Sequence, residues 1–394
     1  MTSQKILIAG AGIGGLAAAA CLLKAGFDVE IYEQAPELGE VGAGIQLSAN
    51  AMHVLNDLGL GEQISAMSVR PGAYVFRLFD TAEIIQEFSL AEDHERHHRA
   101  PYNQIHRADF HDLITAKVRK LKPDVVHLDK MVVRLEEHED SVELKFADGS
   151  VATGDMLIGA DGVKSVVRAQ LFGEVEATYT GDVAWRVIVP VERLPSGFMD
   201  QVMSVWMGPG RHAVSYYIRG GSLLNFVGVV ETDEVSEESW TARFPWENFK
   251  ADFGGWNDDV QTIIDAVDQD QCFRWSLHTR PTIDTWSTHR VTILGDAAHA
   301  TLPYLAQGAA MAIEDGAVLA RALRQAASVP EAFQLYQRNR IERTTRIVEQ
   351  SFTNRTLFHL HSVEEIREAF AARDEGADRN DWLYSYNPLT VELI

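Results

Sequence analysis

Apolar and polar positions near the start of the chain predict a strand, a helix and a second strand. Residues 5–9 are almost entirely apolar, as in a strand that is buried on both faces. A glycine-rich turn follows, and residues 16–25 are rich in Ala and Leu, which favours a helix that Gly26 is placed to end. Residues 27–33 form a second strand pattern that closes on Glu33. Together these segments predict a βαβ unit.

The same patterns predict further elements of a dinucleotide-binding domain downstream. They are helices over residues 49–58, 108–121, 306–327 and 330–352, an antiparallel meander over 125–146, and buried strands at 155–159 and 290–294. Residues 375–394 are polar and then aromatic, so we expect this tail to dock on the protein.

Residues 178–280 differ from the rest of the chain. Strand-like runs dominate there, and Trp and Tyr become frequent. We therefore predict an α/β fold in which a β-rich substrate domain, residues 178–280, is inserted into a discontinuous Rossmann-like domain. That domain would comprise residues 1–177 and 281–394, the second part including the C-terminal helices.

Composition and charge argue against two classes of partner, nucleic acids and membrane surfaces. The 394 residues are 46% hydrophobic and carry a formal charge of −22, with 35 Lys and Arg against 57 Asp and Glu. Such a surface repels nucleic acid and anionic lipid, so neither is expected as a partner. No long apolar run predicts a membrane span. An anionic substrate would need a locally basic pocket.

The cysteines and the start of the chain indicate a reduced, cytoplasmic setting. Cys21 and Cys272 are too few and too far apart for a disulfide framework or a metal cluster, so no metal site is expected. Residues 6–10 run directly into glycines and therefore resemble a strand more than a signal peptide.

The turn after the first strand has the spacing of a dinucleotide-binding loop. Gly10, Gly12 and Gly15 follow the pattern G-x-G-x-x-G, in which glycine allows a tight turn and a close approach to a pyrophosphate. The helix behind it offers free N–H groups and the positive end of its dipole. Glu33 ends the second strand, where a carboxylate can bind ribose hydroxyls. The alternative is a turn without a ligand, and the loop alone does not distinguish NAD from FAD.

Two further motifs follow predicted buried strands. Residues 159–162, Gly-Ala-Asp-Gly, form the first, for which a simple Asp-Gly turn is the alternative. The second contains Gly295, Asp296 and His299. A carboxylate beside glycine at a strand end can bind a sugar-like chain, although Asp296 could instead cap a helix. For His299 we favour a capping or core role over a chemical one.

The three motifs, in this order and near residues 10, 160 and 295, resemble those of the class A flavoprotein aromatic monooxygenases. Residues 39–46, 106–110 and 381–384 are similar to one branch of that family. This branch contains salicylate 1-hydroxylase, 3-hydroxybenzoate 6-hydroxylase and 6-hydroxynicotinate 3-monooxygenase.

The resemblance implies FAD as cofactor, with NADH (or NADPH) as a transient co-substrate and O2. It implies that Glu33 meets the adenosine ribose, Arg107 the pyrophosphate region and Asp296 the ribityl chain. The motif at 159–162 would contribute to the binding of both FAD and the nicotinamide cofactor. The cofactor-binding residues that it implies are Gly10, Gly12, Gly14, Gly15, Glu33, Gln34, Arg107, Asp161, Gly162, Asp296, Gly308 and Ala309.

In this branch, a histidine and a tyrosine four residues later lie on a strand over the flavin and act on the phenol group of the substrate. The matching residues are His212 and Tyr216, which strand geometry places on one face. The implied reaction is hydroxylation through a flavin C4a-hydroperoxide, an electrophile that a phenol attacks well only when its O–H is deprotonated or polarised. Histidine suits that base role, and Tyr216 would orient the oxygen or relay the proton. The alternative for His212 is a histidine satisfied within the sheet.

The substrate itself stays open at this point. Hydroxynicotinate enzymes have histidine where this chain has Gln46 and Tyr304, and 3-hydroxybenzoate enzymes have glutamine in place of Pro303. Arg186, Arg211 and Arg219 are alternative ligands for a substrate carboxylate. The expected pocket residues are Gln46, Trp185, Arg186, Tyr217, Pro303 and Tyr304.

The sequence thus predicts a single-component monooxygenase, monomeric or homodimeric, that hydroxylates a phenolic or hydroxypyridine carboxylic acid, with or without loss of CO2. Three alternatives remain. The first is an FAD-dependent reductase or dehydrogenase of the same fold that inserts no oxygen. The others are a nicotinamide dehydrogenase without flavin and a non-catalytic FAD-binding protein.

Overall fold

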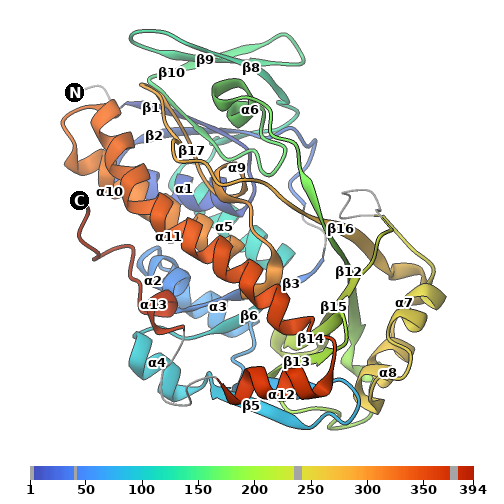
Figure 1. Ribbon diagram of the computed structural model, residues 1–394. Helices are drawn as coiled ribbons and strands as arrows, with labels where there is room; N and C mark the ends of the chain where they lie inside the picture. Colours follow the sequence, from blue (N-terminus) through green and yellow to red (C-terminus); the bar gives the residue numbers. More distant parts are fainter. Residues whose placement is uncertain (1–3, 40–41, 235–241, 373–379) are drawn as a thin grey trace.

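The computed structural model describes residues 4–39, 42–234, 242–372 and 380–394. Among these, the predicted βαβ unit lies at the centre of a five-stranded parallel sheet, because its strands consist of fully buried apolar side chains such as Ile6 and Ile8. The order of this sheet is β17 (Val291–Ile293), β11 (Met156–Gly159), β1 (Lys5–Ala9), β2 (Asp28–Tyr32) and β7 (Val126–His127). Figure 1 shows the sheet in the upper half of the molecule.

Helices cover this sheet, and α10 occupies the middle of the helical layer. It packs against α1, α2 and α11. Gly316 of α10 allows the close approach to α1, since a Cβ there would lie 2.8 Å from the backbone of Ala18. The helices of this part of the molecule are α1 (Ile13–Lys24), α2 (Ala49–Asp57), α3 (Gly61–Met67), α5 (Arg107–Leu121), α6 (Val166–Phe172), α9 (Asp296–His299), α10 (Gly308–Gln325) and α11 (Val329–Phe358).

A seven-stranded sheet forms the lower half. Its order is β16 (Phe273–Thr279), β12 (Thr178–Pro190), β15 (Leu223–Glu231), β14 (Arg211–Ile218), β13 (Met203–Gly208), β4 (Ala73–Leu78) and β5 (Ile84–Ser89). The β-rich character predicted for 178–280 is therefore present. However, β4 pairs in parallel with β13, so the sheet also takes strands from the segment 1–177. The division at residue 178 stays a prediction, and the sheet itself crosses it.

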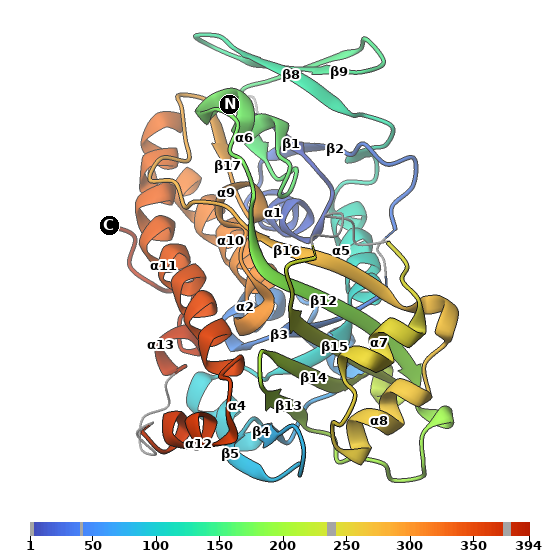
Figure 2. The ribbon, with the colours of Figure 1, turned by 45° about the vertical axis from the view of Figure 1, so that its right-hand side comes forward.

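The two faces of this sheet have different coverings. One face packs against α7 (Trp246–Asp252) and α8 (Asp258–Asp265) through a cluster that includes Trp185 and Phe249. The other face meets the end of α11 and α12 (Val363–Ala371) through Phe358 and Phe370. Figure 2 shows α7 and α8 on the near side of β12, β14 and β15, with α11 and α12 at the opposite side. The α11 face is the one that meets the cavity described below.

The remaining strands form two small sheets. The antiparallel meander predicted for 125–146 lies further along the chain, as β8 (Val132–Glu137), β9 (Val142–Phe146) and β10 (Val151–Gly154), because β7 at the start of that range joins the parallel sheet instead. A two-stranded sheet consists of β3 (Gly44–Leu47) and β6 (Asn103–His106). Short segments are α4 (Glu92–His98), α13 (Asp381–Tyr384), η1 (Val191–Arg193), η2 (Arg219–Gly221), η3 (Gln269–Gln271) and η4 (Pro303–Leu305). Within the described ranges, no helix has the length and apolar character needed to cross a membrane.

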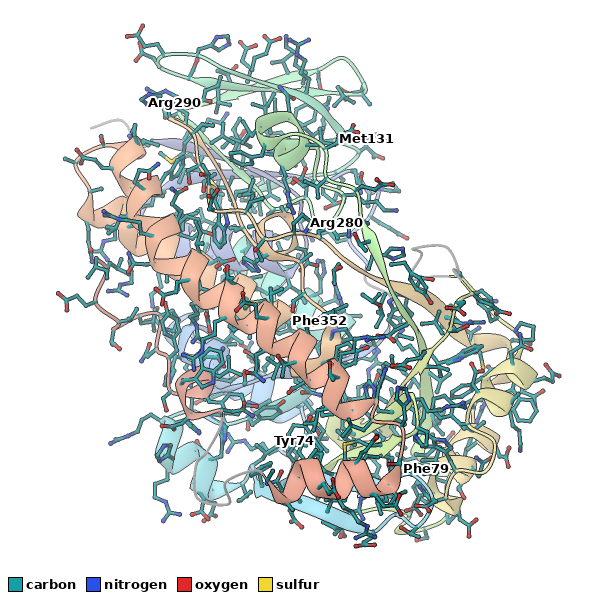
Figure 3. All side chains as sticks on the ribbon, in the orientation of Figure 1. Tyr74, Phe79, Met131, Arg280, Arg290 and Phe352 are labelled. Carbon is teal, nitrogen blue, oxygen red and sulfur yellow. The ribbon has the colours of Figure 1, made fainter. Side chains whose placement is uncertain are left out.

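The C-terminal helices hold the two halves together. The helix predicted for 330–352 continues to Phe358, and Phe352 lies on its exposed side, as Figure 3 shows. The tail docks as expected over its described part, because the guanidinium of Arg346 stacks 3.8 Å from the Trp382 ring centroid. Residues 375–379 of that tail lie outside the described residues.

Candidate active site

A cavity of about 1000 Å³ extends from the glycine loop to the seven-stranded sheet. At one end it is lined by backbone, including Gly12 and Gly162, and at the other by the side chains of His212 and Tyr216. Elements far apart in sequence therefore enclose one space that is large enough for a dinucleotide and a small second molecule.

The three glycines of the loop are needed for different physical reasons. A Cβ on Gly10, whose φ is +101°, would lie 2.4 Å from the carbonyl oxygen of Ala160, and one on Gly15 would lie 2.1 Å from that of Gly10. Because Gly10 and Gly15 have no side chain, the backbone segments at these two positions can pack closely against each other. A Cβ on Gly12 would meet no described atom within 4 Å and would point into open space at the cavity wall. Gly12 thus leaves room for a ligand to approach the backbone.

Two helix N-termini open on the same cavity. Gly12 to Gly14 begin α1, and Gly308 and Ala309 begin α10. Among the described residues, no side chain caps either N-terminus, so the N–H groups there are available to an anionic or carbonyl-bearing ligand. This arrangement fits a dinucleotide that carries a pyrophosphate and ends in a polar ring.

The residues predicted to hold FAD divide into two groups. Those that line the cavity are Gly12, Gly14, Arg107, Gly162, Asp296, Gly308 and Ala309. Glu33 lies beside the loop, where its carboxylate accepts from the N–H of Ala11 at 2.8 Å, and Gln34 is exposed. Gly10 and Gly15 pack against backbone atoms and not against the cavity. Direct contact of this second group with the cofactor stays a prediction.

Asp161 and His299 have structural partners. The Asp161 carboxylate accepts from the Ser165 hydroxyl at 2.5 Å and from the Val167 N–H at 3.1 Å, which ties it to the start of α6. Burial raises its pKa. His299 is buried with its Nε2 2.6 Å from the Asp315 carboxylate, which agrees with the core role favoured for it.

Asp296 is the first residue of α9 and is exposed at the cavity wall. The N-cap position is instead taken by Gly295, whose φ is +59°. The carboxylate of Asp296 is therefore available to hydroxyl groups of a ligand, as the ribityl assignment requires.

His212 is buried at the sheet end of the cavity, with 3% of its surface exposed. Its Nδ1 lies 2.8 Å from Nε2 of His359, and its ring packs against Tyr304 and Phe358. Burial, with a smaller effect of His359, lowers the pKa of His212 well below its usual value. Burial therefore favours the neutral imidazole, in which one ring nitrogen has a free lone pair.

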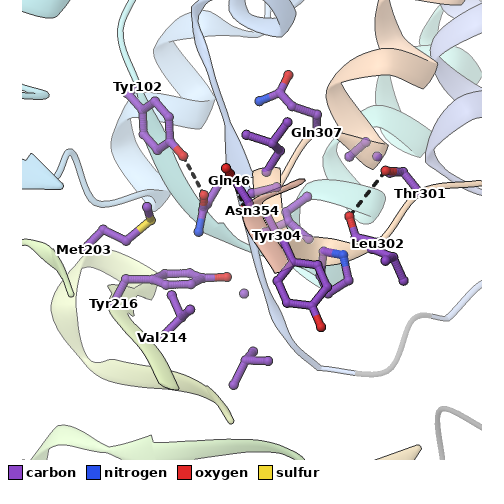
Figure 4. A pocket seen from close by; sticks show the side chains of 18 of the residues that line it. Gln46, Tyr102, Met203, Val214, Tyr216, Thr301, Leu302, Tyr304, Gln307 and Asn354 are labelled. Carbon is purple, nitrogen blue, oxygen red and sulfur yellow. Dashed lines mark hydrogen bonds between the residues drawn. The ribbon is translucent and has the colours of Figure 1, made fainter. Parts of the chain in front are cut away.

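Tyr216 reaches the cavity from the same strand, as the spacing of four predicted. Figure 4 shows Tyr216 on one side of the cavity and Tyr304 on the other, with Gln46 near the space between them. The Tyr102 hydroxyl donates to Gln46 at 2.5 Å. Burial raises the pKa of Tyr216, although a bond with Gln46 opposes this effect. Tyr216 is therefore a neutral hydroxyl that can donate a hydrogen bond.

Strand register places Arg186 beside these two residues. Arg186 pairs with Val227 of β15, which pairs with Val214 of β14, so the three side chains form one row on the cavity face. This row lies between those of His212 and Tyr216. The Arg186 guanidinium lies 5.4 Å from the Trp275 ring centroid. A small ring over Val214 and Val227 would thus be surrounded by an imidazole, a phenol and a guanidinium.

Four of the residues considered for substrate binding, Trp185, Tyr217, Arg211 and Arg219, do not line the cavity. Trp185 and Tyr217 alternate with Arg186 and Tyr216 along their strands, so they point into the α7–α8 cluster on the opposite face. The Trp185 indole donates to Asp252 at 2.6 Å and the Tyr217 hydroxyl to the Met199 carbonyl at 3.2 Å. Of the alternative carboxylate ligands, Arg211 binds the Asp252 carbonyl and Arg219 pairs with Asp109.

The other predicted pocket residues line the cavity, namely Gln46, Pro303 and Tyr304. No pattern in the sequence indicated His359 or the charged groups behind it, which are Asp182, Glu231 and Arg355. His359 is 147 residues away from His212 along the chain, and it follows a long helix in a segment without a local motif. Only the folded chain shows this contact.

Comparison with known proteins identifies the family. Residues 3–351 match the model of the FAD binding domain family. The chain is 37% identical over 388 residues to a 3-hydroxybenzoate 6-hydroxylase of Polaromonas naphthalenivorans, covering 97% of this chain and 96% of the relative. It is also 37% identical to a 6-hydroxynicotinate 3-monooxygenase of Bordetella bronchiseptica, covering 89% and 91%. The chain belongs to the FAD-binding class A aromatic monooxygenases.

A solved structure of a relative agrees with this assignment. Klebsiella pneumoniae HpxO, complexed with FAD and uric acid, superimposes with a TM-score of 0.83 at 27% identity, covering 93% of this chain and 92% of that one. This monooxygenase accordingly uses FAD, with NAD(P)H and O2, and is an aromatic hydroxylase of the hydroxybenzoate or hydroxynicotinate type. The predicted fold class, family and cofactor are confirmed.

Proposed function

We propose that this monooxygenase hydroxylates a phenolic or hydroxypyridine carboxylic acid, and that His212 takes the proton from the ring oxygen. The observation that carries the proposal is the grouping of His212, Tyr216 and Arg186 around Val214 and Val227 on one sheet face. The curated relatives named above act on aromatic acids that bear a hydroxyl group. This chain has the three side-chain types that such a molecule needs.

The glycine-loop end would hold FAD. Gly12 and Gly14 would face its pyrophosphate, Asp296 its ribityl hydroxyls, and the N-terminus of α10 its ring. When bound, FAD supplies the redox and oxygen-transfer chemistry, with electrons from NAD(P)H. The protein residues position the substrate and control its protonation.

His212 would act as the base through its Nε2 atom. Nδ1 is engaged with His359, which leaves Nε2 as the ring nitrogen for the cavity. Removing a proton from a phenol raises the electron density of the ring carbons ortho and para to the oxygen, which makes them better nucleophiles. Proton transfer by a positioned base typically contributes 10²–10⁴-fold in rate, on the order of 3–5 kcal/mol.

Arg186 would bind the substrate carboxylate. The chain carries a net charge of −22, so an anion needs a cation in the pocket itself. Arg186 is the one among the three alternatives that lines the cavity, and its planar guanidinium can bind a carboxylate through two parallel bonds. Tyr216 would then orient the ring oxygen by donating or accepting a hydrogen bond.

The test is a screen of hydroxybenzoates and hydroxypyridine carboxylates for stimulated NADH oxidation by the FAD-loaded protein, with product identification. We expect one acid to give a ring-hydroxylated product in near-stoichiometric ratio to NADH, and mass spectrometry will show whether CO2 is lost. If every acid yields only hydrogen peroxide, the chain is instead an FAD-dependent oxidoreductase that inserts no oxygen.

A further inference from the structure

Behind His212, a buried chain of polar groups leads away from the cavity. Nδ1 of His212 lies 2.8 Å from Nε2 of His359, which is itself 3% exposed. On the other side of that ring, Nδ1 of His359 lies 3.3 Å from a carboxylate oxygen of Glu231. The Glu231 side chain is 31% exposed and therefore in contact with solvent. Two imidazoles and a carboxylate thus connect the cavity to the surface.

The hydrogen-bond partners define the direction in which each of these groups donates to the next. Nδ1 of His359 faces the carboxylates of Glu231 and, at 3.6 Å, Asp182, so this nitrogen carries a proton and donates it. In the neutral ring, Nε2 then accepts from Nδ1–H of His212. That leaves Nε2 of His212 with its lone pair toward the cavity, which is the form that a base requires.

The charges around His359 favour Glu231 over Asp182 as the group that reaches solvent. Asp182 is fully buried, and it accepts from Arg355 at 2.5 and 2.8 Å and from the Tyr304 hydroxyl at 2.6 Å. Both carboxylate oxygens of Asp182 therefore already accept hydrogen bonds. Bonding to His359 outweighs burial and lowers the pKa of Glu231, so a proton that arrives there passes quickly to water.

We propose that His359 and Glu231 carry the proton that His212 takes from the substrate out to the protein surface. This inference rests on the proposed role of His212. As the substrate O–H bond breaks, its proton joins Nε2 of His212, and the proton on Nδ1 moves to Nε2 of His359. The proton on Nδ1 of His359 moves to Glu231, which releases it to water. Both rings end neutral, and no electron is transferred.

The relay is reversible, and it explains how a buried base works repeatedly. When the product oxygen takes back a proton by the same route, both imidazoles regain their starting tautomers. A lone buried imidazole would instead hold the proton as a cation in an apolar site, which is costly. His359 acts here through His212, as a positioning and relay residue.

The experiment uses oxidised, FAD-loaded enzyme without NADH, so that no turnover occurs. The protein is mixed in a stopped-flow instrument with 5-hydroxy-2-nitrobenzoate, a phenol carboxylate whose phenolate absorbs visible light, below the pKa of the free probe. A pH-indicator dye in weak buffer reports the proton that reaches solvent. In the wild type we expect the phenolate and dye signals to rise together, with about one proton released per phenolate.

Two variants test the relay, and one serves as the matched control. His359→Gln keeps an amide that can bond but cannot pass a proton, and we expect both signals to slow at least tenfold while probe affinity changes little. Glu231→Gln leaves the relayed proton on His359, beside the Asp182 carboxylate, so the phenolate should still form while the dye signal is delayed. His361→Gln removes an exposed histidine two residues beyond His359 and should behave as the wild type.

The outcomes separate this inference from the proposed function. Unchanged signals in both His359→Gln and Glu231→Gln would show that the proton leaves through the cavity mouth, which overturns the relay but keeps His212 as base. A full phenolate signal in His212→Ala would overturn the proposed base itself. If His359→Gln does not fold, Glu231→Gln alone decides, because a purely structural role would produce no lag between the two signals.

Discussion

The two ends of the cavity are built on different principles. At the glycine-loop end, the walls are backbone and helix N-termini, and the important property of Gly12 is the absence of a side chain. At the sheet end, the walls are side chains, and the proposed roles of His212, Tyr216 and Arg186 depend on the groups that they present to the cavity. The first end suits a cofactor shared by many enzymes, and the second suits one substrate.

This difference implies that substitutions at the two ends fail in different ways. A change at the loop should remove the cofactor and with it every activity. A change at the sheet should leave the flavin bound and alter the rate, the substrate affinity or the product.

The largest effect should come from Gly12→Val. The new side chain would meet no described protein atom at its Cβ, so the fold should survive, but it would occupy the space that the pyrophosphate needs. We expect FAD affinity to fall roughly 10³-fold, about 4 kcal/mol, as measured by flavin fluorescence titration. Gly72→Val, at an exposed position outside the cavity, is the control, and normal flavin content in Gly12→Val would refute the loop assignment.

His212→Ala should have the second-largest effect. In contrast to Gly12→Val, it should leave the flavin bound and impair the reaction. We expect flavin content to stay normal while kcat for hydroxylation falls about 10²–10³-fold, because proton removal from the substrate is lost. Rapid-quench product analysis measures this, together with the yield of hydrogen peroxide. A variant that hydroxylates at the wild-type rate would remove His212 from the reaction.

Arg186→Gln should weaken binding of the substrate rather than slow the chemistry. Loss of a charged hydrogen bond to a carboxylate costs about 1.5–3 kcal/mol, so KM should rise roughly 10–100-fold with kcat nearly unchanged. The same phenol without its carboxylate should bind both proteins equally. Arg211→Gln, on the opposite face of the sheet, is the matched control. Equal KM changes in both variants would rule out a specific carboxylate contact.

Trp185→Phe should have the smallest effect. It tests the contrast between Trp185 and its neighbour Arg186, which point to opposite faces of the sheet. Trp185 points away from the cavity and donates to Asp252, so its loss should cost about 1–2 kcal/mol of unfolding free energy. KM should stay within about twofold of the wild type. Denaturant unfolding and steady-state kinetics measure the two quantities, and a large change in KM would place Trp185 in the substrate site.

The same contrast explains how much could be predicted from the sequence. The glycine loop, Glu33 and the βαβ unit are local in sequence, and the strand period placed His212 and Tyr216 on one face. The period also implies that Trp185 and Arg186 point to opposite faces, but the sequence does not show which face meets the cavity. That choice depends on how α7 and α8 cover the sheet.

The polar groups behind His212 could not be predicted at all. His359, Glu231 and Asp182 come from three separate elements, and none has a motif that marks it. Likewise, β4 and β5 join the seven-stranded sheet through a parallel pairing with β13 that no local pattern encodes. Contacts of this kind depend on the tertiary packing of elements that are distant in sequence.

The measurement that tests the account most directly is the pH dependence of hydroxylation by His212→Ala. If His212 only removes the substrate proton, a substrate that arrives already ionised no longer needs it. The rate of product formation by the variant should then rise about tenfold per pH unit toward the pKa of the substrate phenol, while the wild-type rate stays nearly flat. A variant whose rate stays low and independent of pH over the same range would contradict the assignment of His212 as the base.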